Sequence, residues 1–225
     1  MEYIFLNCHC QTQTRGFMNF NLENYNLEIK RKAFHCMSIV FPIFYLITSK
    51  LTMVMVLTVI TGIAVSLDIS RHYNPAIQAW VARFFTTIMR PDETSGNFKL
   101  SGVSYMFLGF FITCLLFSKG VAISAFLVLI VSDTFAALVG KKIGKPMANG
   151  KSIEGSIAFA ASAMLIGMLA YTFHTYGTTF SGIVIASGVT TWVEYNADRF
   201  DINDNLAIPV TFGSVVAVWG WLLSL

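Results

Sequence analysis

The sequence predicts an all-α integral membrane protein, and two observations carry this prediction. Of its 225 residues, 55% are hydrophobic and only 12% are charged, whereas soluble domains carry roughly 25% charged residues. The hydrophobic residues form continuous runs without the polar–apolar alternation of strands, and open sheets cannot lie in lipid. We therefore expect one polytopic bundle of about seven transmembrane helices, with one further amphipathic helix at the membrane interface.

Seven apolar segments are candidates for spans, because a bilayer core of about 30 Å requires about 20 apolar residues in a helix, or about 17 in a short one. Two pairs of segments are separated only by Ser49-Lys50 and by Lys119-Gly120, which predicts tight hairpins. The sixth segment is the shortest. The predicted spans are residues 33–49, 51–67, 101–118, 121–139, 156–174, 179–194 and 206–225.

One amphipathic helix is predicted between the second and third spans. It would begin at Asn74-Pro75, with the asparagine as its cap and the proline at its first helical position. Apolar residues then recur at the spacing of one helical face, at Ile77, Trp80, Val81, Phe84, Phe85 and Ile88. Such a helix either lies in the membrane interface or covers one end of the bundle.

The basic residues predict the orientation of this single domain, residues 28–225, which follows a polar segment of residues 1–27. All of the 15 Lys and Arg residues except Lys50 and Lys119 lie before the first span or in every second loop after it. Cytoplasmic loops carry such an excess. We expect a cytoplasmic N-terminus in the inner or plasma membrane of a bacterium or archaeon, or in the ER membrane of a eukaryote. The small net charge of +3, without a Lys/Arg-rich run, argues against nucleic acid as a partner.

The stretch from Val131 to Ser156 is the strongest candidate for a functional site. Asp133 lies inside an apolar span near its cytoplasmic end, where an ionisable side chain costs a few kcal/mol and is a functional-site hypothesis by default. Gly140 and Gly144 follow on the same helical face, and small residues permit close approach of a helix or a ligand. The alternative is that Asp133 only joins two packed helices.

Four lysines follow Asp133 within a short distance, at Lys141, Lys142, Lys145 and Lys151. Together with exposed glycine backbone they could hold phosphate oxygens, or they could be only the basic residues expected in a cytoplasmic loop. Gly150-Lys151-Ser152 does not complete a P-loop, because the first glycine of that motif is missing. Ser152 and Glu154 also have the pattern of a helix start.

An acidic loop precedes the last span, with carboxylates at Glu194, Asp198, Asp201 and Asp204, followed by Asn205. Carboxylates opposite a lysine-containing loop suit a magnesium–nucleotide site, because Mg²⁺ prefers one or two carboxylates together with phosphates. Asp201 or Asn203 could instead cap the last helix.

Two further polar groups lie on the same predicted membrane face. Arg31, Lys32 and His35 open the first span, where snorkelling is the simpler interpretation. Asp68 and Arg71 close the second span, where a surface i,i+3 pair is the simpler interpretation.

These pieces, in this order, resemble the family of CTP-dependent lipid kinases, which includes dolichol kinase, phytol kinase and the CTP-dependent diacylglycerol kinase. The resemblance extends from about residue 28 to the C-terminus. Its specific part is Asp133, Ala136, Gly140, Gly144-Lys145 and Lys151-Ser152-Ile153-Glu154-Gly155. The other matching pieces are Arg31-Lys32-Ala33-Phe34-His35, Asp68 with Arg71, Ser101-Gly102-Val103-Ser104-Tyr105 with Gly109, and Asp204-Asn205-Leu206-Ala207-Ile208-Pro209.

The resemblance implies an enzyme that transfers the γ-phosphoryl group of CTP to a lipid alcohol at the cytoplasmic face, with polyprenol, dolichol, phytol or diacylglycerol as the acceptor. It implies that Asp133 and Asp204 hold Mg²⁺ or another divalent cation, or that one of them accepts the hydroxyl proton, while Glu194 supports the metal. The residues implied to bind the nucleotide are Gly140, Gly144, Lys145, Lys151, Ser152, Glu154, Gly155, Arg31, Lys32, His35, Arg71 and Asn205.

The chain departs from the family pattern in two places. The family often has Lys-Thr at Lys151-Ser152, and it commonly has two aspartates before the asparagine that corresponds to Asn205, where this chain has Asn203-Asp204. The number of carboxylate ligands for the metal therefore stays open, as does the oligomeric state, for which a dimer is one option.

Two other functions remain as alternatives. Asp198-Arg199-Phe200-Asp201 matches the ending of the phosphatidate cytidylyltransferase signature, although the lysine and His-Gly-Gly portion that should precede it is absent. A small-solute transporter is the more distant alternative, because polar residues in spans also mark transport paths. The outer turns carry almost no charge, which favours the kinase.

Overall fold

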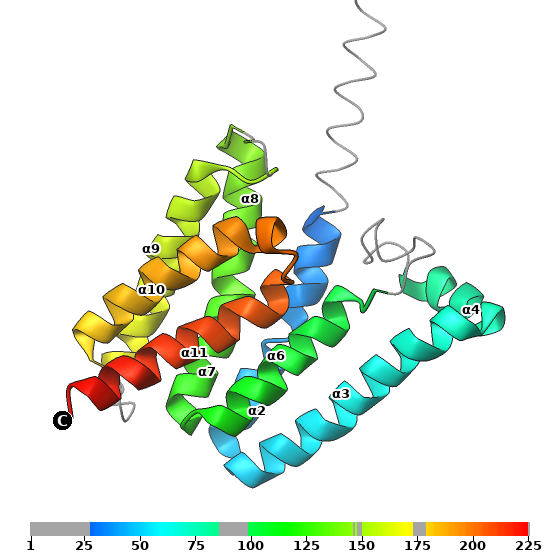
Figure 1. Ribbon diagram of the computed structural model, residues 1–225, viewed down its shortest axis with the longest axis horizontal. Helices are drawn as coiled ribbons and strands as arrows, with labels where there is room; N and C mark the ends of the chain where they lie inside the picture. The colour runs from blue at the N-terminus through cyan, green and yellow to red at the C-terminus, as the bar shows by residue number, and fades with distance from the viewer. Residues whose placement is uncertain (1–27, 86–98, 146, 148–149, 173–178, 225) are drawn as a thin grey trace, which may run out of the picture.

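All regular structure in the described part of the chain is helical, which confirms the all-α prediction (Figure 1). The structure is a computed structural model that describes residues 28–85, 99–145, 147, 150–172 and 179–224. Residues 28–37 are helical and lead into α2. The further elements are α2 (Val40–Ile47), α3 (Lys50–Tyr73), α4 (Pro75–Phe85), α6 (Gly102–Leu116), α7 (Lys119–Leu127), η1 (Val128–Ser132), α8 (Asp133–Ile143), α9 (Ile153–Thr172), α10 (Phe180–Asn196), η2 (Ala197–Phe200) and α11 (Asp204–Leu222).

Among the residues that the structure describes, four helices are long and apolar enough to cross a membrane, which indicates a membrane protein. Three of them are α3, α9 and α11. The fourth is the continuous helix Lys119–Ile143, which consists of α7, η1 and α8. α6 is apolar but shorter. The predicted span 33–49 is interrupted by a turn at Ser38, where the Ser38 hydroxyl donates to the carbonyl oxygen of His35 at 2.6 Å. The total of seven spans therefore stays a prediction.

The core of the bundle is aromatic and aliphatic, and the outer surface is apolar as well. Phe110 of α6 stacks on Phe126 of α7 with ring centroids 4.1 Å apart, and both are fully buried. Ile47 and Leu51 show the opposite extreme, with 81% and 70% of their surface exposed. In lipid such side chains lie in a medium as apolar as themselves, so the surface that would be a liability in water is suited to a bilayer.

Both predicted hairpins are present, and they brace each other. Lys50 Nζ donates to the carbonyl oxygens of Leu115 and Phe117 at 3.0 and 2.9 Å. Lys119 Nζ donates to the carbonyl oxygens of Leu46 and Thr48 at 3.0 and 2.8 Å. Lys50 thus binds the last carbonyl groups of α6, and Lys119 binds those of α2. The last carbonyl groups of a helix have no N–H partner within the helix, so each lysine caps the first helix of the other hairpin.

The predicted amphipathic helix is present as α4, which follows α3 at one side of the bundle (Figure 1). Its predicted last apolar residue, Ile88, lies outside the described residues. Asn74 Oδ1 accepts from the backbone N–H of Ala76 at 2.9 Å, which confirms the predicted cap before Pro75. Whether α4 lies in the membrane interface stays a prediction.

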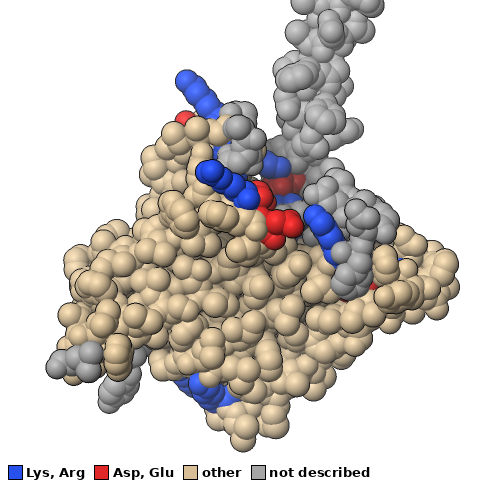
Figure 2. Space-filling view, viewed as in Figure 1, with Lys and Arg blue, Asp and Glu red and all other residues tan. Residues whose placement is uncertain are grey.

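Most charged side chains gather at one end of the molecule, and a broad uncharged surface separates them from a smaller basic patch at the opposite end (Figure 2). The charged end contains the start of residues 28–37, α8 and the start of α11 (Figure 1). The fold therefore brings together the ends of helices that are far apart in the sequence.

Candidate active site

Asp133 lies at the junction of η1 and α8 and is only 4% exposed. η1 is a π-helical segment of five residues, Val128–Ser132, inside an otherwise α-helical span. Such π segments change the facing of the residues that follow and occur frequently at functional sites. The hydrophobic pattern of the sequence does not predict this segment, because an insertion of this kind leaves no clear mark in it.

Two side chains from residues 28–37 meet this carboxylate. Lys32 Nζ donates to Oδ2 of Asp133, and His35 Nε2 lies 3.7 Å from the same oxygen. His35 Nε2 is also 3.3 Å from the carbonyl oxygen of Leu129, within the π segment. Lys32 and His35 are buried and stand one helical turn apart. Three residues from the predicted site are thus brought into contact.

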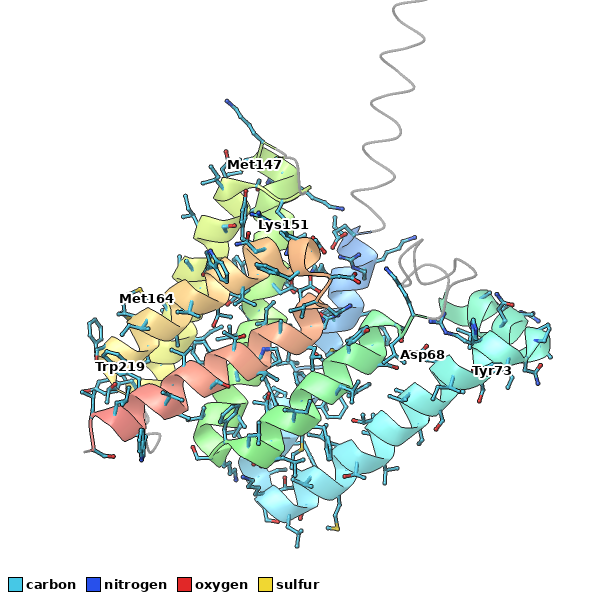
Figure 3. All side chains as sticks on the ribbon, in the orientation of Figure 1. Asp68, Tyr73, Met147, Lys151, Met164 and Trp219 are labelled. Carbon is cyan, nitrogen blue, oxygen red and sulfur yellow. The ribbon has the colours of Figure 1, made fainter. Side chains whose placement is uncertain are left out.

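Lys151 and Glu194 form a second pair at this end of the molecule (Figure 3). Lys151 Nζ donates to Oε1 of Glu194 at 2.7 Å and also to the carbonyl oxygen of Glu194. Burial alone would lower the pKa of Lys151, but the neighbouring carboxylates, Glu194 first and Asp204 next, outweigh it and raise that pKa above its ordinary value. Lys151 is therefore a cation at neutral pH.

Asp204 connects the two pairs. It begins α11, is 7% exposed and is close enough to interact electrostatically with Asp133, with Lys151 and with Glu194. Lys32, His35, Asp133, Lys151, Glu194 and Asp204 are called the Asp133 cluster below. Three carboxylates are thus gathered at a buried position with two lysines and a histidine. Burying so many charged groups costs free energy, and such clusters are typical of sites that bind a cation or a charged ligand.

Asp133, Asp204 and Glu194, the predicted metal ligands, are not placed so that all three could bind one metal ion together. In the part of the chain that the structure describes, no three His, Cys, Asp or Glu side chains are placed to hold a metal ion by themselves. Glu194 is instead paired with Lys151. Asp133 and Asp204 fit the one or two carboxylates that Mg²⁺ uses when substrate phosphates complete its shell.

Gly140, Gly144 and Gly155 have a packing role around Ser152. A Cβ atom on Gly140 or Gly144 would lie 2.8 or 2.3 Å from the Ser152 hydroxyl, and one on Gly155 would lie 2.8 Å from the carbonyl oxygen of Ala136. Ser152 is buried, and its hydroxyl accepts from the N–H of Gly155 at 3.1 Å, as the predicted helix start requires. The small residues thus let α9 begin directly against α8, which positions Lys151.

Other predicted nucleotide contacts lie around the rim of the cluster. The side chain of Lys145 is exposed, and its backbone N–H donates to Oε2 of Glu154 at 3.2 Å. Arg31 pairs with Oε1 of Glu28 at 2.6 Å, and Lys141 pairs with Oε2 of Glu28 at 3.0 Å. Glu28 is buried and holds both cations, and its role was not predicted because it becomes apparent only once α8 lies beside residues 28–37.

Arg71 belongs to a different group at the same end of the molecule. Its Nε lies 2.8 Å from Oδ1 of Asp68, and it also donates to the carbonyl oxygen of Lys99 at 3.0 Å. Oδ2 of Asp68 accepts from the N–H and hydroxyl of Ser101, both at 2.8 Å, and from the hydroxyl of Ser104 at 2.5 Å. These residues join α3 to the start of α6. The serines have helix-cap spacing, which is the signal that could have suggested the contact.

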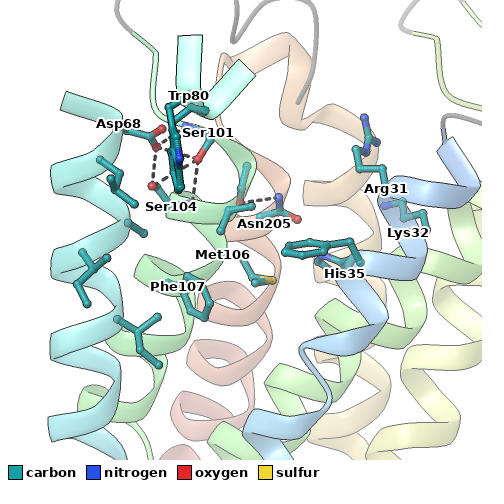
Figure 4. A pocket seen from close by; sticks show the side chains of 18 residues that line it. Arg31, Lys32, His35, Asp68, Trp80, Ser101, Ser104, Met106, Phe107 and Asn205 are labelled. Carbon is teal, nitrogen blue, oxygen red and sulfur yellow. Dashed lines mark hydrogen bonds between the residues drawn. The ribbon is translucent and has the colours of Figure 1, made fainter. Parts of the chain in front are cut away.

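A cavity of about 410 Å³ lies between the Asp68 group and residues 28–37 (Figure 4). Arg31, Lys32 and His35 line one side, and Asn205 lies between the two sides. Asn205 Nδ2 donates to the carbonyl oxygen of Gly102 at 3.0 Å, so it holds α11 against α6. Asn205, which was predicted to contact the nucleotide, therefore lines this cavity.

The chain is similar to three proteins. It is 44% identical over 201 residues to an uncharacterized protein of Rickettsia prowazekii, covering 89% of this chain and 98% of the relative. It is 29% identical over 211 residues to CTP-dependent diacylglycerol kinase 1 of Saccharomyces cerevisiae, covering 81% of this chain and 70% of the relative. It is 26% identical over 194 residues to an uncharacterized protein of Methanocaldococcus jannaschii, covering 84% and 92%. Neither a family model nor a solved structure matches it.

Proposed function

Since this chain belongs to one family with the Rickettsia prowazekii protein and is distantly similar to CTP-dependent diacylglycerol kinase 1, we propose that it is a CTP-dependent lipid kinase. The reaction transfers the γ-phosphoryl group of CTP to the hydroxyl group of a membrane lipid alcohol. The acceptor is a polyprenol or dolichol, phytol or diacylglycerol.

One observation supports this proposal above the others: Asp133, buried in an apolar helix, lies in one electrostatic cluster with Lys151 and Asp204. Asp133 begins α8, Asp204 begins α11, and Lys151 lies in the short segment directly before α9. An aspartate that only joined packed helices would not need two more carboxylates near it, and carboxylates of like charge are unfavourable neighbours. Phosphoryl transfer needs such a set, because positioning and neutralisation of charge dominate its catalysis.

In the proposed reaction the lipid hydroxyl oxygen forms a bond to the γ-phosphorus while the bond between that phosphorus and the β–γ bridging oxygen breaks. CDP leaves with the electron pair of the broken bond. The hydroxyl proton passes to the carboxylate of Asp133 or Asp204. Lys151 neutralises the triphosphate, and Lys32 and His35 hold Asp133 in place from the other side.

A divalent cation, Mg²⁺ in the first instance, would be held by Asp133 and Asp204 together with phosphate oxygens, and it would supply charge neutralisation at the transferred group. Lys145 and Arg31 at the rim, with the backbone near Gly140 and Gly144, complete the proposed nucleotide contacts. The same proposal places the charged end of the bundle on the cytoplasmic face, following the excess of basic residues there.

The direct test uses the full-length protein in detergent with CTP or ATP labelled at the γ-phosphate. Diacylglycerol, a polyprenol, dolichol and phytol are offered separately, and the phosphate extracted into organic solvent is counted. Label transferred from CTP to one alcohol supports the proposal. Phosphatidate is offered in a separate reaction, where release of labelled pyrophosphate with a cytidylyl lipid identifies a cytidylyltransferase instead. No extracted label with any of the alcohols contradicts the kinase.

A further inference from the structure

The cavity beside the Asp133 cluster has two chemically different walls. Ile60, Ile63, Ala64 and Leu67 form an apolar wall from one face of α3, at the i, i+3, i+4, i+7 spacing of a helix. The opposite wall is cationic and carries Arg31, Lys32 and His35. A cavity with an apolar side and a few polar groups is typical of sites for small organic ligands, and about 410 Å³ lies within their usual range.

The apolar wall reaches the outer surface of the bundle. Ile63 is 56% exposed and Leu67 is 41% exposed, although both line the cavity. Trp80 of α4, which is half exposed, also lines it and lies above the opening between α3 and α6 (Figure 4). α3 is one of the helices that can cross the membrane, so this side of the cavity faces acyl chains rather than water.

The cationic wall is shared with the proposed catalytic site. Lys32 and His35 line the cavity and at the same time contact Oδ2 of Asp133. These two side chains therefore connect the cationic wall of the cavity with the carboxylate. Lys151 and Glu194 belong to the same cluster but are not part of the cavity wall.

Resting on the proposed function, we propose that this cavity binds the hydroxyl end of the acceptor lipid, while its tail leaves past the exposed side chains of Ile63 and Leu67 on α3 into the bilayer. The hydroxyl group lies at the Lys32–His35 wall, next to Asp133. The nucleotide approaches the cluster from the Lys151 side, so donor and acceptor reach the carboxylate from two directions. Phosphoryl transfer requires the attacking and leaving oxygens to be roughly in line, and approach from two different sides allows that alignment.

The wall made by Asp68, Ser101 and Ser104 has a different part in this arrangement. Both serine hydroxyls already donate to Asp68, so this wall keeps α3 and α6 at a fixed separation. The width of the cavity, and thereby the kind of tail that it accepts beside Ala64 and Phe107, follows from that separation.

The first experiment fills the cavity from the α3 side. Ala64→Phe places a ring on the apolar wall, and we expect the KM for the lipid alcohol to rise about tenfold while the KM for CTP stays unchanged. Ser66→Phe is the matched control, because Ser66 is exposed on the same helix and is not part of the cavity wall. An unchanged KM for the alcohol in Ala64→Phe overturns the inference.

The second experiment does not depend on turnover. A long-chain primary alcohol with a diazirine near its hydroxyl group is cross-linked to the full-length protein in detergent without nucleotide. We expect labelled peptides to contain Met106 and Phe107, and Ala64→Phe but not Ser66→Phe to remove the label. Competition by diacylglycerol, polyprenol and phytol distinguishes the possible acceptors.

The two experiments separate this inference from the proposed function. If no alcohol is phosphorylated but the cavity is labelled, the kinase proposal fails and the lipid site stands. If an alcohol is phosphorylated but the label is spread over the outer helix faces and is unaffected by Ala64→Phe, the kinase stands and this site is wrong.

Discussion

Two buried aspartates at the charged end of the bundle have opposite surroundings. Asp68 is paired with Arg71 one turn away, and its other oxygen accepts three hydrogen bonds from Ser101 and Ser104. Asp133 contacts Lys32, which is 101 residues away in the sequence, and lies near two further carboxylates, Asp204 and Glu194.

The difference separates a carboxylate that stabilises the fold from one that is placed for chemistry. Both carboxylate oxygens of Asp68 are bound by neighbouring side chains and by a backbone N–H. The charge of Asp68 is therefore neutralised by Arg71, and its hydrogen bonds connect α3 to α6. Asp133 stands among like charges, and burial makes such an arrangement unfavourable. This cost in stability is explained if the carboxylates bind a divalent cation whose remaining ligands are phosphate oxygens. Four substitutions test this comparison.

Asp133→Asn has the largest expected effect. The amide can neither accept the hydroxyl proton nor bind a cation as a carboxylate does, so we expect turnover to fall at least about a hundredfold. Membrane insertion should be unchanged. The measurement is phosphate transfer from CTP, with the amount of protein in the membrane fraction as its control, and a normal rate would contradict the assignment.

Lys151→Met removes the cation that pairs with Glu194. We expect kcat/KM for CTP to fall about tenfold or more, because a charge-assisted contact to phosphate is lost. The KM for the lipid should be unaffected. Lys151→Arg is the matched control: it keeps the charge and should recover part of the activity. Equal losses in both variants would show that Lys151 matters for packing alone.

The raised pKa of Lys151 adds a pH dependence to that comparison. Because its pKa is above the ordinary lysine value of about 10.4, the ammonium group stays charged through neutral and mildly alkaline pH. The stability from its pairing with Glu194 is present below the ordinary value and is lost only as the pH rises through the higher folded-state value. Thermal unfolding of Lys151→Met should therefore differ from wild type by a constant amount between about pH 7 and 9.

Asp68→Asn should affect stability and not chemistry. The amide keeps the shape but loses the ion pair with Arg71 and part of the hydrogen bonding to Ser101 and Ser104. We expect a loss of about 1–3 kcal/mol in the free energy of unfolding, with turnover at low temperature close to wild type. Thermal unfolding in detergent measures the first quantity. A loss of turnover as large as that of Asp133→Asn, without a change in stability, would remove the distinction between the two aspartates.

Gly144→Ala has the smallest expected effect and tests the packing beneath Lys151. An added Cβ would lie 2.3 Å from the Ser152 hydroxyl and 2.4 Å from the carbonyl oxygen of Gly140, so we expect a loss of about 1 kcal/mol or more. Gly62→Ala is the control, because nothing lies within 4 Å of its added Cβ. It should be neutral or slightly stabilising, since alanine is the better helix former. Equal stabilities in the two variants would contradict the packing role.

Several local features could be predicted from the sequence with the correct residues. A cap was expected at Asn74, was one interpretation of Ser152, and was expected at either Asp201 or Asn203. Asn74, Ser152 and Asn203 all accept backbone hydrogen bonds at the starts of their helices. Caps involve residues two or three positions apart, so their signal is contained in a short stretch of sequence. Asp133 was also identified correctly as a buried ionisable residue, since a lone carboxylate in an apolar run is conspicuous.

Other features depended on contacts between distant segments. The glycines after Asp133 were predicted to permit the close approach of a helix or a ligand, and the structure shows Gly140 and Gly144 against Ser152, directly before α9. The role of Glu28 between Arg31 and Lys141 was not predicted. A small residue permits a close approach without saying what approaches, and a buried acid does not identify its partner.

The sequence by itself determined that this protein is helical, that it has spans apolar enough for a membrane, and that one carboxylate among those spans needs an explanation. These are properties of composition and of periodicity along the chain. Only the tertiary structure decided which cations reach Asp133, that a π segment precedes it, and that a cavity with one apolar and one cationic wall lies beside it. Those features arise where helices pack across about a hundred residues of chain, and such pairings are set by the packing of the whole bundle rather than by any one segment.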